Sequence, residues 1–325
     1  MNTASILFEE VPFETLRSIV KRYFGHAEEL ECTLLKGGLF NTTYKLTLPL
    51  LQRKLILRLG PVNRQHLLPF EHHLMKAEEM AYQLLSTLDI PCPDVLVCDN
   101  TKQYLDRDFM ITDYIPGISL ADESISEESK KGIYKQVAEL TARMHSITGP
   151  AYGRIADLLQ GRGYYKWQEF LLAHAAEVGD SCLNYGVFKP EEVQRILRIY
   201  EENSELYRDI RTPRMLHGDL WAGNVLVQRR PEEERYEVTA ILDADRALFG
   251  DSDFEFASPW LPFSDEAKDE SSQRNAVRIL KMDTYRMLFT FIDTYIWNVQ
   301  YRDHAQFESN KQRTLDMLCS IEKRL

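Results

Sequence analysis

A change of hydrophobic pattern at Pro116-Gly117 constrains the fold of this chain more than any other feature. Before this point, the sequence contains short apolar runs bounded by turn residues, which are typical of strands, with a short helical stretch ahead of them and one prominent helical stretch among them. After it, apolar residues recur at helical spacing over most of the chain. A small strand-rich lobe followed by a larger helical lobe is an α+β architecture. We therefore predict two lobes, covering residues 1–115 and 116–325.

The individual elements follow from the same periodicity and from the turn residues between them. In the first lobe, helices are predicted over 12–25 and 70–88. A hairpin around Gly37-Gly38 and three further strands are predicted over 30–48, 54–60, 94–99 and 108–115. In the second lobe, the predicted helices cover 126–147, 164–177, 190–210, 272–300 and 307–323, and two strand-like runs lie within 215–243.

The composition is that of an ordinary globular protein. The 325 residues are 44% hydrophobic and 27% charged. No window approaches the roughly 18 uninterrupted apolar residues of a membrane span, and the N-terminus lacks the basic and apolar segments of a secretion signal. The five cysteines include no C-x-x-C pair, so we expect free thiols in a reducing compartment. These features predict a cytoplasmic protein that has no membrane partner.

The formal net charge of −11 bears on the class of partner. Nucleic acid binding requires clustered lysine and arginine, so the charge argues against a nucleic acid partner. It mildly favours a cationic small molecule. A solvated acidic surface explains the same total equally well.

One segment carries residues that suit phosphoryl transfer. In "MLHGDLWAGNVLV", residues 215–227, Asp219 can accept the proton of an attacking hydroxyl, and Asn224 can reach the same space if the loop curls back. Downstream, "VTAILDADRALFGD" places Asp243 at the end of an apolar strand. Amide and carboxylate oxygens suit Mg²⁺, and phosphoryl transfer depends on positioned phosphates and neutralised charge. Aspartate and asparagine are also favoured in turns, which is the structural alternative.

These motifs resemble those of the aminoglycoside phosphotransferase and choline kinase group of small-molecule kinases, relatives of the protein kinases. The resemblance covers about 30–260, and Gly218 stands where protein kinases usually have arginine. It implies a bilobal protein-kinase-like fold in which Asp219 is the catalytic base. Asn224 and Asp243 are then the ligands of Mg²⁺, and His217 supports the loop without reacting.

On the nucleotide side, the resemblance makes "LLKGGLFNTTYKL", residues 34–46, the loop that covers ATP or GTP. Gly37 and Gly38 stand in place of G-x-G-x-x-G, and backbone N–H groups in such a turn can hold phosphate. Asn41 and Thr42 are further candidate phosphate donors. The strand lysine is replaced: Arg58 stands at the matching place, and Lys54, four residues earlier, is the other candidate.

The resemblance assigns two further nucleotide contacts. Glu78 matches the helix glutamate that pairs with the strand cation, and Glu79 is its competitor. The segment "MITDYIPG", residues 110–117, matches the connection between the lobes, where the backbone groups of Asp113 and Ile115 would hold adenine.

Several further residues have more than one interpretation. Asp245 is either a second carboxylate near the metal or a loop contact, and Asp251 and Asp253 more simply fix the loop or cap the following helix. Four aromatic residues lie where they form either an acceptor pocket or part of the core: Trp260, Tyr295, Trp297 and Tyr301.

The expected function is therefore ATP- or GTP-dependent phosphorylation of a hydroxyl on a small molecule. The resemblance points first to an antibiotic-resistance kinase that acts on aminoglycoside-like or other hydroxylated amines. A metabolic kinase of choline, homoserine or a related alcohol is the close alternative. A nucleotide-binding pseudokinase is the alternative from another class, favoured by the altered glycine loop and opposed by the intact Asp219, Asn224 and Asp243. The sequence does not indicate an oligomeric state.

Overall fold

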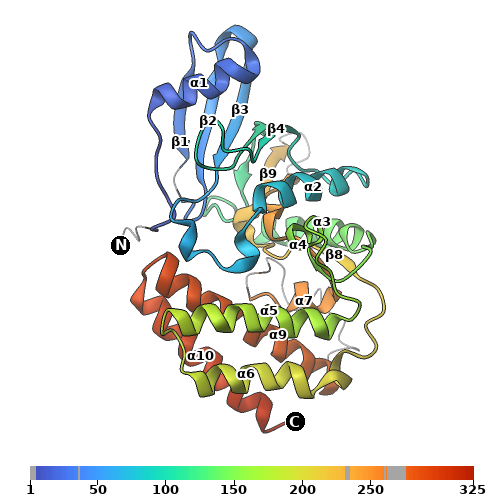
Figure 1. The fold of residues 1–325 in the computed structure, drawn as a ribbon. Coiled ribbons are helices and arrows are strands. Elements are labelled where there is room, and N and C mark those ends of the chain that lie inside the picture. Colours follow the sequence, from blue (N-terminus) through green and yellow to red (C-terminus); the bar gives the residue numbers. More distant parts are fainter. Residues whose placement is uncertain (1–4, 36, 231–234, 260, 262–275) are drawn as a thin grey trace.

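The computed structural model describes residues 5–35, 37–230, 235–259, 261 and 276–325. A small lobe that carries a β-sheet lies against a larger lobe made mainly of helices (Figure 1), so the predicted α+β class and bilobal arrangement are confirmed. Trp260 falls outside the described residues.

The small lobe is built on an antiparallel sheet of five strands in the order β1-β2-β3-β5-β4. Its strands are β1 (Glu31–Leu35), β2 (Thr42–Leu48), β3 (Arg53–Leu59), β4 (Val95–Asp99) and β5 (Phe109–Asp113). Helix α1 (Phe13–Phe24) crosses the outer face of this sheet (Figure 1). Four of these five strands lie within the runs predicted from the sequence, and β3 begins one residue before its predicted run of 54–60.

Buried and partly exposed side chains alternate along β3, and this alternation decides which of them reach the space between the lobes. Leu55, Leu57 and Leu59 are fully buried and join α1 in the core of the small lobe. Successive strand residues point to opposite faces of a sheet. Ile56 and Arg58 therefore point away from α1, toward the second lobe.

Helix α2 (Leu74–Ser86) lies between the two lobes. It begins four residues later than predicted, because Pro69–Glu71 forms a separate 3₁₀ turn. The connection before it is attached to the helical lobe, since the carbonyl of His66 accepts hydrogen bonds from Tyr295 Oη and Gln300 Nε2, both at 3.1 Å. This attachment fixes the position of α2 relative to the second lobe.

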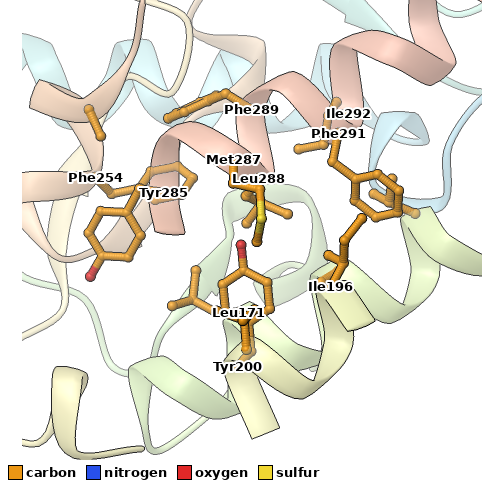
Figure 2. Packing of buried hydrophobic residues seen from close by; sticks show 14 of the residues in the cluster. Leu171, Ile196, Tyr200, Phe254, Tyr285, Met287, Leu288, Phe289, Phe291 and Ile292 are labelled. Carbon is orange, nitrogen blue, oxygen red and sulfur yellow. The ribbon is translucent and has the colours of Figure 1, made fainter. Parts of the chain in front are cut away.

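The helical lobe is held by a large apolar core (Figure 2). It contains many aromatic side chains, and polar atoms of these side chains are paired: Tyr200 Oη donates to the carbonyl of Thr284 at 2.8 Å, and Trp167 Nε1 donates to Tyr285 Oη at 2.8 Å. The helices are α3 (Glu127–Met144), α4 (Ile155–Leu158), α5 (Trp167–Asn184), α6 (Pro190–Glu202), α7 (Ser252–Ala257), α9 (Ala276–Tyr295) and α10 (His304–Glu322).

Two small antiparallel sheets position the chain segments that carry the chemical motifs. One has the order β10-β9-β6 and the other β7-β11-β8. Their strands are β6 (Ile118–Ser119), β7 (Gly153–Arg154), β8 (Arg214–Leu216), β9 (Val225–Arg230), β10 (Arg235–Ile241) and β11 (Leu248–Gly250). The two strand-like runs predicted here correspond to β9 and β10. The sequence missed β6, β7, β8 and β11, which are too short to show a periodicity.

The helix predicted over 272–300 differs from the structure at its C-terminal end. Helix α9 stops at Tyr295, and Ile296–Gln300 forms a π-helical turn. Apolar spacing over one turn does not separate an α-turn from a π-turn, and π-turns occur frequently at functional sites. No helix in the described ranges is long and apolar enough to cross a membrane. All five cysteines are free thiols, as predicted.

Candidate active site

A cavity of about 780 Å³ lies between the two lobes. It is lined by the loop between β1 and β2, the inner face of β3, the segment after β5, the loop after β8, the turn after β10 and the π-turn after α9. The predicted site residues among its lining are Gly37, Gly38, Asn41, Arg58, Asp113, Ile115, Asp219, Asn224 and Asp243. Residues that are far apart in sequence thus share one cavity.

The loop that carries Asp219 runs from the end of β8 to the start of β9 and is closed by internal hydrogen bonds. Asn224 Nδ2 donates to the carbonyl of Asp219 at 2.9 Å, so the loop curls back and meets the condition under which Asn224 shares the space of Asp219. His217 is fully buried: its Nε2 donates to the carbonyl of Leu242 at 2.9 Å, and its Nδ1 accepts from the Asp219 N–H at 3.3 Å. Burial lowers the pKa of His217, so the ring is neutral and supports the loop.

Two features outside the predicted site set also hold this loop. Glu255 of α7 is buried and accepts the N–H groups of His217 at 2.5 Å and Gly218 at 3.2 Å. Asp251 caps α7, as predicted, by accepting the N–H of Asp253 at 3.2 Å. Glu255 follows one turn after that cap. Asp251 is a sequence signal for the start of α7, but nothing in the sequence indicates that Glu255 binds the loop of Asp219.

Gly218 is required where it stands. Its φ of +78° lies in the left-handed region, and a Cβ there would lie 2.4 Å from the carbonyl oxygen of Arg246. Glycine therefore lets the loop of Asp219 lie directly against the turn that follows Asp243.

We expect Gly218→Ala to lower the free energy of unfolding by more than about 2 kcal/mol, because strain and a backbone clash add together. Gly132→Ala is the matched control, since Gly132 lies within α3 with nothing within 4 Å of an added Cβ. The control should gain about 0.5–1 kcal/mol from helix propensity. Denaturant titration of both variants measures these changes, and equal stability of the two would contradict the packing described for Gly218.

Asp219 lies deep in the cavity. Burial raises the pKa of its carboxyl group to about 7, while the nearby guanidinium of Arg246 acts in the opposite direction. A carboxylate poised near neutral pH suits the transfer of a proton from an alcohol.

The cationic residue of β3 forms a buried network. Arg58 Nη1 donates to Glu78 Oε1, and Arg58 Nη2 donates to Asp243 Oδ1. Tyr82 Oη donates to Glu78 at 2.6 Å and accepts the Asp243 N–H at 2.9 Å. Of the alternatives left open by the sequence, the structure thus brings Arg58 and Glu78 together in the cleft.

The two competing residues lie elsewhere. Lys54 is exposed on the same face of β3, nearer the start of the strand. Glu79 pairs with Lys76 on the outer side of α2.

An all-oxygen donor set surrounds the turn after β10. Asp243 adopts a φ of +60°, which is uncommon for a residue other than glycine and is found often at functional sites. One carboxylate oxygen from each of Glu78, Asp243 and Asp245 lies within 4.8 Å of the others, and Glu78 Oε2 is buried without a hydrogen-bond partner. Carboxylate and amide oxygens, including Asn224 beside them in the cavity, fit a hard divalent cation. Asp245 therefore lies near the candidate metal ligands.

Thr42 does not take the role predicted for it. Its side chain is fully buried on the α1 side of β2, where its hydroxyl donates to the carbonyl of Glu9 at 2.9 Å and accepts from Arg107 at 2.8 Å. Thr43, the next residue, lines the cavity instead. The correction follows from strand alternation, which sends adjacent side chains to opposite faces.

At the other end of the cavity, the backbone after β5 is partly engaged. The N–H of Asp113 donates to Asp94 O at 3.2 Å, and the N–H of Tyr114 donates to Lys54 O at 3.1 Å. Within the described residues, no acceptor takes the N–H of Ile115. This donor is therefore available to a planar ligand.

The helical lobe forms one wall of the cavity, called here the second-lobe wall. Some of its residues have a role that the sequence left open, and others were not suggested by the sequence. Trp297 and Tyr301 line the cavity with ring centroids 5.2 Å apart, whereas Tyr295 is buried in the core. Asp293 and Arg246 also line it, and neither was predicted. Their neighbours in sequence give no sign that these two residues face the loop of Asp219.

Comparison with known proteins places this geometry in a family. A model of the phosphotransferase enzyme family matches residues 31–285. The chain is similar to acyl-CoA dehydrogenase family member 10 of Mus musculus, with 24% identity over 251 residues, which is 74% of this chain and 21% of that protein. The chain therefore spans about a fifth of the length of this curated relative.

Solved structures show the same fold. The aminoglycoside phosphotransferase APH(4)-Ia aligns with a TM-score of 0.67 and 16% identity, over 95% of this chain and 99% of that one. An ethanolamine kinase of Plasmodium vivax aligns with a TM-score of 0.65 and 15% identity, over 99% and 93%. Because the family model matches most of the sequence, the chain belongs to the phosphotransferase enzyme family, and these solved structures share its fold.

Proposed function

We propose that this enzyme transfers the terminal phosphate of ATP, or alternatively GTP, to a hydroxyl group of a small amine. The observation that carries the proposal is the placement of Asp219, Asn224 and Asp243 in one cavity with the ion pair of Arg58 and Glu78. We assign nucleotide binding to the lobe of residues 1–115, and catalysis and acceptor binding to the lobe of residues 116–325. We also propose that the enzyme acts in the cytoplasm.

The nucleotide lies between the glycine loop and the segment after β5. The carbonyl of Asp113 and the N–H of Ile115 receive the base, and Gly37, Gly38 and Asn41 cover the phosphates. Gly37 has a φ of +111°, which lets the loop turn tightly over the cleft. A similar structure supports ATP: an APH(4)-Ia variant was solved with AMP-PNP and hygromycin B, and it aligns with a TM-score of 0.66 at 17% identity.

Asn224 and Asp243 are the side chains that would hold Mg²⁺, with Asp245 close by. When bound, the ion would neutralise charge on the nucleotide phosphates. Arg58 contributes a second positive charge and is kept in place by Glu78, which is fully buried.

Asp219 orients the acceptor hydroxyl and takes its proton. The hydroxyl oxygen forms a bond to the terminal phosphorus while the bond between that phosphorus and the bridging oxygen breaks, and the nucleoside diphosphate leaves. The neutral His217 and the amide of Asn224 keep Asp219 oriented through the hydrogen bonds described above.

The second-lobe wall supports an amine acceptor. Asp293 Oδ2 is buried at the cavity without a hydrogen-bond partner, and the rings of Trp297 and Tyr301 lie on the following turn. A carboxylate beside aromatic faces favours a cation. We therefore favour a hydroxylated amine of the aminoglycoside type, which would make the protein an antibiotic-resistance kinase. Choline, ethanolamine or homoserine is the alternative acceptor.

Asp293→Asn is expected to stabilise the protein at alkaline pH while raising the KM for an amine acceptor. Burial raises the pKa of Asp293 to about 7 from 3.8, although Arg246 and Arg313 counter it, so the ionised form costs stability. The penalty grows as the pH rises from about 4 to about 7 and is complete above 7. The melting temperature of the variant should exceed that of the wild type by at least about 2 °C at pH 8, and the difference should vanish near pH 4. The exposed Asp180→Asn is the control, and a lower melting temperature for Asp293→Asn at pH 8 would contradict this placement of the carboxylate.

A phosphorylation screen of the purified protein tests the proposed function. ATP, Mg²⁺ and one acceptor at a time are incubated with the enzyme, and the product is detected by mass spectrometry. Aminoglycosides, choline, ethanolamine and homoserine are the acceptors, with non-amine polyols as the control. Phosphate transfer to an amine supports the proposal. Binding of ATP without Mg²⁺-dependent hydrolysis or transfer would favour the pseudokinase alternative.

A further inference from the structure

We propose that Arg246 is a further catalytic residue, whose guanidinium group contacts the phosphoryl group during its transfer. This inference rests on the proposed function. Arg246 follows Asp243 by three residues, lines the same cavity as Asp219 and Asn224, and was not among the residues singled out by the sequence.

The guanidinium group is anchored on one side by a buried carboxylate. Arg246 Nη2 donates to Glu71 Oε1 at 2.9 Å, and the Glu71 side chain is fully buried. The other oxygen of Glu71 accepts the N–H of Leu68 at 2.9 Å and a bond from Gln300 Nε2. Glu71 is therefore fixed by both the connection before α2 and the π-turn, and it holds Arg246 in one position.

Arg246 lines the cavity and has more N–H donors than the one that Glu71 accepts. A guanidinium has five N–H donors, and Glu71 takes one of them. The Arg246 side chain is 18% exposed, and this exposed part contributes to the cavity wall. A planar group with free donors suits the oxygens of a phosphoryl group, which it can bind in pairs.

Arg246 lies between the glycine loop, which we assign to the nucleotide, and the loop of Asp219, which we assign to the acceptor. On the nucleotide side, its guanidinium carbon lies 5.9 Å from the ring centroid of Phe40 in the glycine loop. On the acceptor side, the Arg246 backbone lies against Gly218, which precedes Asp219. The terminal phosphate must pass from the first side to the second.

The charges around Arg246 agree with this role. Burial acts to lower the pKa of its guanidinium, but Glu71 and Asp219 outweigh burial and raise it. The group therefore stays protonated throughout the reaction. It donates hydrogen bonds to the phosphoryl oxygens and stabilises their charge, and the proton of the acceptor hydroxyl still goes to Asp219.

Nucleotide binding tests this proposal without depending on turnover. Calorimetry with Mg²⁺ compares ADP with AMP-PNP, because only the second carries a terminal phosphoryl group. Arg246→Ala should weaken AMP-PNP binding at least about tenfold and leave ADP binding within about twofold, since a hydrogen bond to a charged group contributes about 1.5–3 kcal/mol. Arg246→Lys should recover part of the loss. Arg195→Ala is the control, because Arg195 pairs with Glu322 on the surface, and it should bind both nucleotides like the wild type.

Two further comparisons keep the result interpretable. If Arg246→Ala does not fold because Glu71 is left unpaired, the double variant Glu71→Gln/Arg246→Met removes both buried charges and should still bind ADP. Equal weakening of ADP and AMP-PNP, or no weakening of either, would overturn the role of Arg246 while leaving the proposed function intact. A wild-type protein that binds neither nucleotide would overturn the proposed function, and this inference with it.

Discussion

Asp219→Ala is expected to lower kcat by at least about 10²-fold while leaving the KM for ATP nearly unchanged. The reason is that Asp219, which lines the cavity, is the residue that we propose orients the acceptor hydroxyl and accepts its proton, and general-base losses are typically 10²–10⁴-fold. Steady-state kinetics with saturating Mg²⁺ measures both parameters.

Asp219→Asn separates the chemical role from the structural one. The amide keeps the shape of the side chain and leaves the backbone bonds to His217 and Asn224 in place. It should nevertheless lose nearly as much kcat as alanine, because an amide does not accept the proton. Near-normal turnover in either variant would show that another group acts as the base.

Arg58→Met should lower the free energy of unfolding by about 3–5 kcal/mol and abolish transfer. Glu78 is fully buried, and removing its cationic partner leaves an uncompensated carboxylate beside Asp243. Burial already raises the pKa of Glu78 despite the opposing effect of Arg58, which is consistent with a costly charge. Denaturant titration measures the loss.

The same strand provides a control for this result. Arg53 pairs with Asp113 at 2.7 Å, but both side chains are about 40% exposed, so Arg53→Met should cost no more than about 1 kcal/mol. The double variant Arg58→Met/Glu78→Gln should recover much of the stability and none of the activity. If Arg58→Met were as stable as Arg53→Met, the buried pair would not be the interaction that fixes α2 against β3.

The sequence predicted those parts of the molecule that depend on local pattern. The alternation of β3 identifies the face of Arg58, because a residue two positions from a buried leucine shares its face and an adjacent one does not. The spacing of Asp219 and Asn224 is compatible with a loop that returns on itself, and the bond between the Asn224 amide and the Asp219 carbonyl shows that the loop does so. In β2, alternation shows that Thr42 and Thr43 point to opposite faces, but the sequence does not show which of the two faces is the cavity side. It therefore could not tell which threonine lines the cavity.

The remaining parts depend on contacts between distant segments. Glu255 reaches the loop of Asp219 from a helix about 40 residues later, and Arg246 is held by Glu71 from the first lobe. Neither contact leaves a periodicity or a spacing in the sequence. The π-turn that brings Trp297 and Tyr301 to the cavity is likewise invisible to a pattern based on 3.6 residues per turn.

The central claim is that Asn224 and Asp243 hold Mg²⁺ on a nucleotide whose terminal phosphate faces Asp219. A crystal structure of the enzyme with Mg²⁺ and AMP-PNP tests it most directly. The account predicts a metal ion bound by an oxygen of each of these two side chains and a terminal phosphate on the side of Asp219. A nucleotide bound outside this cavity, or a metal that contacts neither Asn224 nor Asp243, would contradict it.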